Sequence, residues 1–286
     1  MKRKYLLPIM IIILISCKNK PLSFENESRF FFRLPVNADA YFKFDLKRIN
    51  KVKTLHNLQR VKDVISLFKE NGIDFIKETE IIYGALFFSA PEKNVFILKG
   101  DFNLEKMSRL LSPTHRKKSS EEAVYYESLD RKKWDLLLDI KGKEIVFSRG
   151  QRIHDEYDKS ARIFHTLNVL KRVDFSAQGW LLLGMTQSVK NYLQNNIELE
   201  LFAAASFYSF SYTIHPENNT LFFNIQIYVK RKELVNEIVG TVFSYYEKMV
   251  NTYSVIKKSF YHFRVYQKGN FTRINISVNL DNIILQ

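Results

Sequence analysis

Cysteine is almost absent from this chain of 286 residues, and the one copy is Cys17. No disulfide can form within the chain that follows it, so a hydrophobic core has to stabilise the fold. A cysteine nucleophile and a thiolate metal site are excluded from that part of the chain for the same reason.

Sequence motifs of the common enzyme classes are absent as well. There is no G-x-S-x-G elbow, no P-loop, no G-x-G-x-x-G and no H-E-x-x-H. Asp135 and Asp139 share one face of an expected strand, about 13 Å apart at about 3.3 Å per residue. Glycosidase carboxylates are about 5 Å or about 6.5–9.5 Å apart. We therefore assign no catalytic residue and expect a non-enzymatic binding or envelope-assembly protein. A surface adhesin for acidic polysaccharide and a hydrolase of envelope polymers are the open alternatives.

Long apolar runs are also missing. The longest run near the start, Leu6–Ile15 with Pro8 inside it, is shorter than the about 20 residues of a membrane-spanning helix. It follows the cationic Lys2-Arg3-Lys4 and has the length of a signal-peptide core. The run ends in Leu14-Ile15-Ser16-Cys17, which resembles the lipobox of bacterial lipoproteins: an apolar, a variable and a small residue before the acylated cysteine.

The resemblance implies cleavage between Ser16 and Cys17, a diacylglyceryl group on the Cys17 sulfur and a fatty acyl group such as palmitate on the new amino group. The alternative is an ordinary secretory signal, but that signal favours small residues in an A-x-A-like pattern, which Leu14 does not fit. A composition rich in Lys, Asn, Ile and Phe makes the chain similar to the lipoproteins of spirochaetes. The expected location is the bacterial cell envelope, anchored by lipid, with the membrane and the side left open.

The net charge is strongly positive, at +14. The leader holds three of the 44 basic residues and none of the 30 acidic ones, so the remaining chain carries +11. A nucleic-acid partner is not expected, because the signal peptide implies that the chain is exported. A tethered basic protein can lie against anionic head groups, where each Lys or Arg contributes about 1 kcal/mol, or bind an anionic polymer or an envelope protein. The alternative is that the lysines only maintain solubility.

The chain divides by composition into five segments. Residues 1–16 are the expected signal peptide and 17–29 a polar tether. Residues 30–150 and 177–286 are two expected repeats, and 151–176 a partly helical connector. We predict an α+β fold of two related halves, each a mostly antiparallel sheet with helices on one face.

Two hairpins support this internal repeat. Apolar runs flank the turns at Pro91–Asn94 and Pro216–Asn219, and helical patterns follow at Leu104–Leu111 and Leu234–Tyr245. Each half ends in further hairpins. The strands around Ile81–Phe88 are apolar on both faces and should be covered on both sides.

The second half offers a candidate binding face. Alternation along its strands places amides, aromatic rings and arginines opposite the apolar side chains. Such a surface can hold a sugar or a polyanion, because guanidinium and amide groups supply directional hydrogen bonds. The alternative is a plain solvated face of the sheet. The candidate residues are Asn224, Gln226, Tyr228, His262, Arg264, Tyr266, Arg273 and Asn275.

Two weaker patterns remain. His154-Asp155-Glu156, Asp158 and His165 could hold a divalent metal if the fold gathered them, but acids in the first turn of a helix explain them more simply, so we assign no metal and no cofactor. The basic runs at 115–118, 131–133 and 230–232 are expected in loops or at helix starts, as solvated turns or as a shared polyanion patch.

Overall fold

The computed structural model describes residues 34–35, 38–49, 78–121, 123–130, 135–139, 143–148, 177–184, 186–196, 205–252 and 258–279. Within these ranges, seven strands lie before residue 150: β1 (Ala40–Asp45), β2 (Thr79–Leu86), β3 (Val95–Gly100), β4 (His115–Ser119), β5 (Ala123–Ser128), β6 (Asp135–Asp139) and β7 (Glu144–Ser148). Five follow: β8 (Gly179–Gly184), β9 (Ala205–His215), β10 (Thr220–Val229), β11 (Phe260–Lys268) and β12 (Phe271–Asn279). The α-helices are α3 (Leu46–Ile49), α7 (Leu104–Leu111), α9 (Gln187–Asn196) and α10 (Leu234–Thr252).

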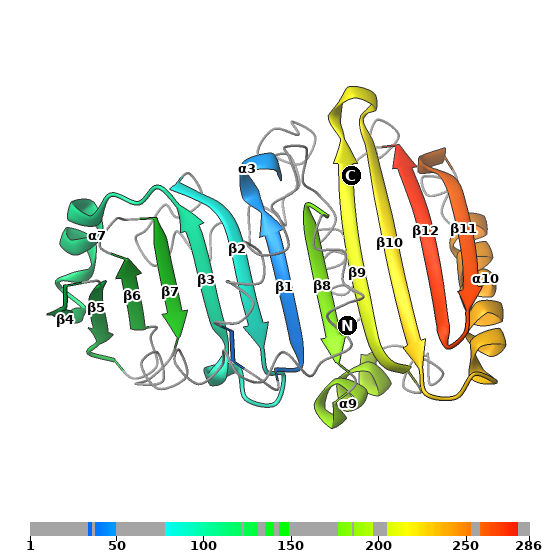
Figure 1. The fold of residues 1–286 in the computed structure, drawn as a ribbon, viewed down its shortest axis with the longest axis horizontal. Coiled ribbons are helices and arrows are strands. Elements are labelled where there is room, and N and C mark those ends of the chain that lie inside the picture. The colour runs from blue at the N-terminus through cyan, green and yellow to red at the C-terminus, as the bar shows by residue number, and fades with distance from the viewer. Residues whose placement is uncertain are drawn as a thin grey trace.

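All twelve strands belong to one sheet, in the order β11-β12-β10-β9-β8-β1-β2-β3-β7-β6-β5-β4 (Figure 1). Every pair of neighbours is antiparallel, so the mostly antiparallel α+β fold is confirmed. The sequence predicted one sheet per half, whereas β1 and β8 pair from Ala40↔Leu183 to Lys43↔Trp180 and join all strands. This pairing removes two open edges, whose unpaired backbone groups are otherwise a liability.

The predicted hairpins are present. β2 and β3 are joined through the 3₁₀ turn η1 (Pro91–Lys93), and β9 and β10 through η6 (Pro216–Asn218). Asn219 closes the second turn at φ 48°, a conformation that Asn tolerates better than most residues. The β11–β12 turn uses Gly269 at φ 60°.

Helices α7 and α10 pack on the same side of the sheet, here called the helix side. Met107 and Leu111 of α7 join a buried cluster with Leu98, and Val235 and Ile238 of α10 join another with strand residues such as Ile227 and Ile274. Helix α9 directly follows Thr186, whose Oγ1 caps the helix by accepting a hydrogen bond from Val189 N at 3.2 Å.

The opposite side of the sheet is also buried at its centre. Tyr83, Ile97 and Trp180 are all 0% exposed and belong to one apolar cluster. Ile97 and its neighbour Leu98 point to opposite sides, and Leu98 is 1% exposed. The predicted burial of these strands on both faces is confirmed at their centre, while Phe88, beyond the end of β2, is 36% exposed.

Several predictions fall outside the described residues. These are the cleavage at Ser16, the lipidation of Cys17, the tether and the 151–176 connector. None of the helices in the described ranges combines the length and apolarity needed to cross a membrane.

Candidate functional site

The eight candidate binding residues lie together on the side of the sheet opposite α10. Residues that pair directly across antiparallel strands point to the same side. Asn275 of β12 pairs with Arg264 of β11 and with Asn224 of β10. On β9 the row continues with Ser211. We call this surface the polar face. It consists of Asn224, Gln226, Tyr228, His262, Arg264, Tyr266, Arg273 and Asn275.

A second row runs parallel to the first. Arg273 of β12 pairs with Tyr266 of β11 and with Gln226 of β10. Ser209 of β9 continues the row. Arg264 and Arg273 are therefore diagonal neighbours, with backbones about 7–8 Å apart.

Exposure falls steadily across the polar face. Tyr266 on β11 is 45% exposed, and Arg264 and Arg273 are exposed as well. Asn224 and Asn275 are half-buried, Gln226 is 8% exposed and Ser209 on β9 is 1% exposed. The surface is therefore accessible mainly along its outer strands, β11 and β12.

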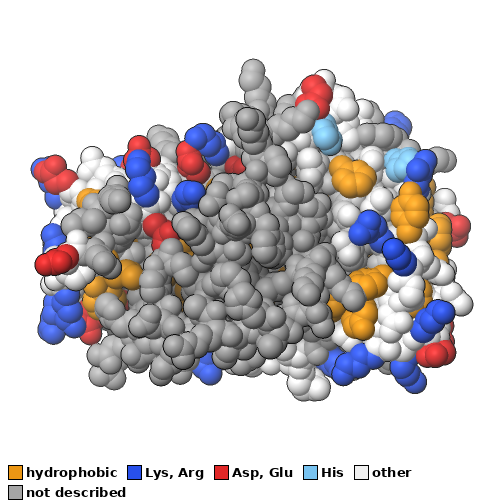
Figure 2. All heavy atoms as spheres, in the orientation of Figure 1, with side chains coloured by type: hydrophobic (Ala, Val, Ile, Leu, Met, Phe, Trp, Pro, Cys, Tyr) orange, Lys and Arg blue, Asp and Glu red, His pale blue; other side chains and the backbone are white. Residues whose placement is uncertain are grey.

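Charge is segregated in these four strands. β9, β10, β11 and β12 contain no Asp or Glu. Their basic side chains all lie on the side of the polar face, where the register places His215, His262, Arg264, Lys268 and Arg273. Figure 2 shows basic and hydrophobic side chains over this part of the sheet, with acidic ones only at its margin.

The two arginines of the polar face have no carboxylate partner among the described residues. In the described ranges neither Arg264 nor Arg273 forms an ion pair. His215, at the far end of β9, has Nδ1 3.3 Å from Glu217 Oε1 in η6. Exposed guanidinium groups without a carboxylate partner attract anions, and each can bind a carboxylate, sulfate or phosphate with two parallel hydrogen bonds.

Three aromatic rings pack together on the same side of the sheet as the arginines. Tyr228 stacks on Phe207 with centroids 5.2 Å apart and an interplanar angle of 20°. Its ring is also 5.0 Å from that of Phe271, which pairs with Lys268 across the β11–β12 turn. Sequence reasoning found Tyr228 and missed Phe207 and Phe271. The signal was available for Phe271, because it stands two residues before Arg273 and so on the same side of its strand.

Two amide oxygens of the polar face are buried without a partner. Asn224 Oδ1 and Asn275 Oδ1, on directly paired residues, accept no hydrogen bond from the part of the chain that the structure describes. A buried acceptor without a donor costs about 1–3 kcal/mol. The pair marks a place where a hydrogen-bond donor is missing.

The comparisons with known proteins bear on the fold. No protein-family model matches the chain, and none of the curated proteins matches it in sequence. The fold resembles that of TP0453. Crystal form I of this Treponema pallidum protein superposes with a TM-score of 0.54 at 13% identity, covering 88% of this chain and 93% of that one. Crystal form III gives a TM-score of 0.52 at 14% identity, covering 88% and 94%. The similarity to TP0453 shows the fold alone, since the identity is this low.

The basic run at 115–118 is not in a loop, as the sequence suggested, but in the edge strand β4. Lys118 Nζ lies 3.0 Å from Glu127 Oε2 and 5.8 Å from the centre of the Tyr125 ring. The hydrogen bond and charge of Lys118 lower the pKa of Glu127. Basic side chains on an edge strand discourage pairing with another sheet, which accounts for the run without a ligand. The run at 230–232 does precede a helix, as predicted, and 131–133 lies outside the described residues.

Asp135, one of the two carboxylates compared above with a glycosidase pair, is buried and hydrogen-bonded to the backbone. It is 5% exposed, and its Oδ1 accepts a hydrogen bond from Ser128 N at 2.8 Å. Burial, followed by the charges of Asp135 and Glu127, raises the pKa of Tyr125 to about 12. The side chain of Asp139 is outside the described part of the structure.

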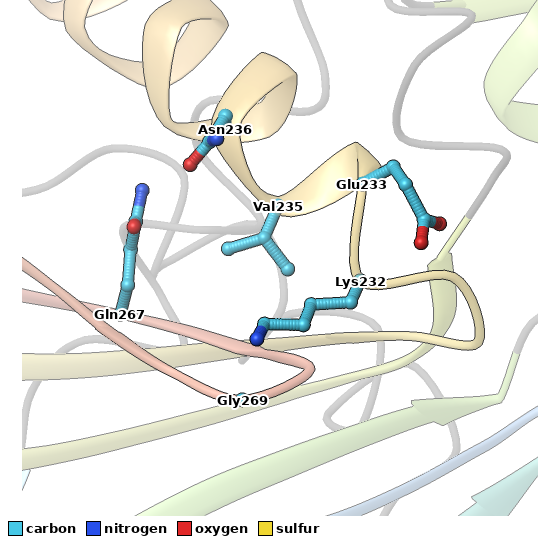
Figure 3. Close-up of a pocket in the computed structure, with 6 residues that line it drawn as sticks. All are labelled: Lys232, Glu233, Val235, Asn236, Gln267 and Gly269. Atoms are coloured by element: carbon cyan, nitrogen blue, oxygen red, sulfur yellow. The ribbon is translucent and has the colours of Figure 1, made fainter.

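A shallow pocket of about 400 Å³ lies on the helix side, between the start of α10 and the β11–β12 turn (Figure 3). Gln267 points towards Asn236, Lys232 extends towards the turn, and Glu233 points away from both. Its lining residues are Lys232, Glu233, Val235, Asn236, Gln267 and Gly269. These groups do not form a nucleophile–base pair or a set of metal ligands.

Metal ligands do not gather in the described ranges, where no group of three or more His, Cys, Asp or Glu side chains is found. The set at His154-Asp155-Glu156, Asp158 and His165 lies outside those ranges.

Proposed function

We propose that this chain is a lipid-anchored, non-enzymatic protein of the bacterial cell envelope whose polar face binds an anionic partner. The lipobox-like residues before Cys17 support the anchor. The fold supports the location, since TP0453 is a spirochaete protein associated with the envelope. The basic polar face supports binding of an anionic polymer or an acidic surface of an envelope protein.

One observation carries the proposal: four adjacent strands lack every carboxylate and direct all their basic side chains to one side. A sheet face exposed only for solubility gains nothing from excluding one sign of charge, because mixed charges keep a surface soluble. A field of one sign attracts partners of the other sign and speeds their association.

The binding is tested by replacing the two exposed guanidinium groups of the polar face, those of Arg264 and Arg273. The Arg264→Gln/Arg273→Gln double variant should bind heparin, as an anionic probe, about tenfold more weakly or worse, since a hydrogen bond to a charged group is worth about 1.5–3 kcal/mol. Equilibrium binding at several salt concentrations gives the affinity and its salt dependence, which should become shallower.

The matched control is Arg109→Gln/Arg116→Gln, which removes the same charge from exposed positions at the other end of the sheet. It should change the affinity less than twofold. If both double variants lose affinity equally, net charge and not the polar face drives binding, and the proposal fails.

The anchor is tested at Cys17. Cells given a radiolabelled fatty acid should incorporate label into the wild-type chain and not into Cys17→Ser, because the serine hydroxyl does not accept the lipid. The wild type should fractionate with membranes. An unlabelled wild-type chain, or one whose Cys17 carries a free thiol by mass spectrometry, would contradict the anchor.

The strand order supports the further proposal that the chain consists of two related halves. From the β1–β8 seam outwards, one direction runs β1-β2-β3-β7-β6 and the other β8-β9-β10-β12-β11. In both series a single strand comes first and a hairpin follows it. The last hairpin then joins the sheet through its later strand, so that β7 is next to β3 and β12 is next to β10. β5 and β4 extend the first series only.

A further inference from the structure

We infer that the partner of the polar face is an acidic polysaccharide, bound through its anionic groups by Arg264 and Arg273 and through its hydroxyl groups by Asn224 and Asn275. This inference rests on the proposed function and specifies the ligand of the same surface.

The shape of the accessible surface favours a linear polymer. Exposure decreases from β11 to β9, so the accessible part is a strip about two strands wide, or about 10 Å. Along β11 the strip carries His262, Arg264, Tyr266 and Lys268 on alternate residues over about 20 Å. A flat array of lipid head groups needs a broad exposed surface, whereas a single extended chain fits a strip.

The unpaired amide oxygens favour a ligand with hydroxyl groups. Asn224 Oδ1 and Asn275 Oδ1 need donors, and anionic groups offer only acceptors. The oxygens are buried as the side chains stand: Asn275 is on β12, within the accessible strip, and Asn224 is beside it on β10. A ligand hydroxyl would reach them only after rotation about the broad χ2 torsion of Asn. A sugar hydroxyl beside an anionic group satisfies both the amides and the adjacent arginines.

Tyr266 supplies the third element of sugar recognition. It is 45% exposed and stands between Arg264 and Lys268 on the same side of β11. Its ring offers a flat apolar surface next to a polar hydroxyl. Sugar rings carry apolar C–H faces between their polar edges, so a ring placed between two cations matches a chain that alternates charge with C–H surface.

The test compares two polyanions on the detergent-solubilised, lipidated full chain. Polygalacturonate is an acidic polysaccharide, and inorganic polyphosphate has dense charge without C–H faces or neutral hydroxyl groups. The wild type should bind polygalacturonate. Asn224→Ala/Asn275→Ala and Tyr266→Ala should each weaken this binding at least fivefold and change polyphosphate binding less than twofold, while Arg264→Gln/Arg273→Gln weakens both.

Matched controls on α10 are Asn236→Ala and Tyr245→Ala, both at exposed positions on a different element. They should leave both affinities within twofold of wild type, and circular dichroism should confirm the fold of every variant. Detergent micelles containing phosphatidylglycerol test the membrane alternative and should not displace polygalacturonate.

The outcomes separate the inference from the proposed function. Arginine-dependent binding of polyphosphate without binding of polygalacturonate overturns the inference and leaves the anionic face intact. Equal losses for both polymers in the Asn and Tyr variants, or displacement by the anionic micelles, also overturn it. If no polyanion binds at all, the proposed function itself fails.

Discussion

Tyr41, near the middle of the sheet, illustrates how far burial alters a single residue. It is 6% exposed, its hydroxyl donates to Pro35 O at 2.9 Å and accepts from Ala38 N at 3.0 Å. Burial is the largest cause that raises the pKa of Tyr41 to about 12, and the charge of Asp39 adds to it. The hydrogen bond from Ala38 acts in the opposite direction.

This raised pKa predicts a loss of stability in alkali. The unfolded chain releases the proton near pH 10, whereas the folded chain keeps it until about pH 12. Between these values the folded state binds more protons, so the free energy of unfolding falls as pH rises, by about 1.4 kcal/mol per pH unit. The contribution is fully present below pH 10.

Urea denaturation at several pH values between 9 and about 12 checks the prediction for Tyr41. Tyr41→Phe should be less stable than wild type at neutral pH, because two hydrogen bonds are lost, and should show a shallower alkaline decline. Tyr245→Phe, at a position 49% exposed on α10, is the control for removing a tyrosine hydroxyl elsewhere. An identical slope in wild type and Tyr41→Phe would show that Tyr41 does not titrate as described.

At the scale of elements, the sequence predicted those whose signal is local. The spacing of apolar residues identified α7 and α10, and the Pro and Asn turns identified the hairpins β2–β3 and β9–β10. Each signal lies within about a dozen residues, so no distant contact is needed to read it.

Strand β4 shows what local patterns miss. Its residues, HRKKS, have no apolar alternation, and four of the five are exposed. They form a strand because β5 offers an open edge, with Lys117 opposite Tyr126 and Lys118 opposite Tyr125. Pairing to a preformed edge is a property of the neighbour and not of the five residues themselves.

The polar face, too, could be predicted from the sequence only in part. The side on which each residue lies was predictable, because strand side chains alternate with a period of two. The burial of Gln226 was not, since it depends on what packs over β9 and β10 in the folded chain. The pairing of Asn224 with Asn275, and hence the two unpartnered oxygens, depends on the register between strands about fifty residues apart in the sequence.

For the whole molecule, the central fact is the seam between β1 and β8. Asp39, at the start of β1, accepts a hydrogen bond from Phe88 N at 2.6 Å and another from Thr186 Oγ1, the cap of α9. Lys43 of β1 directs its Nζ to Ala177 O, 3.5 Å away, just before β8. Trp180 of β8 pairs with Lys43 and is fully buried. Contacts of this kind couple the strands before residue 150 to those after it.

This coupling predicts that a destabilising substitution at one end of the sheet also lowers the unfolding midpoint measured at the β1–β8 seam. Asn103 Oδ1 caps α7 by accepting a hydrogen bond from Lys106 N at 2.9 Å, so Asn103→Ala should cost about 1 kcal/mol. The chain has two tryptophans, and in a Trp134→Phe background Trp180 alone reports on the seam. In this background, Asn103→Ala should lower the unfolding midpoint measured by Trp180 fluorescence as much as the midpoint measured by far-UV circular dichroism.

The reason is that α7 packs through Met107 and Leu111 on a sheet that continues, strand by strand, to β8. If the sheet unfolds as one unit, both probes coincide in every variant. Asn103→Asp keeps a side-chain acceptor at the cap and should restore the midpoint. Two separate transitions, with the Trp180 midpoint unchanged by Asn103→Ala, would mean that the seam holds together two parts that unfold independently, and the continuous sheet would not be a cooperative unit.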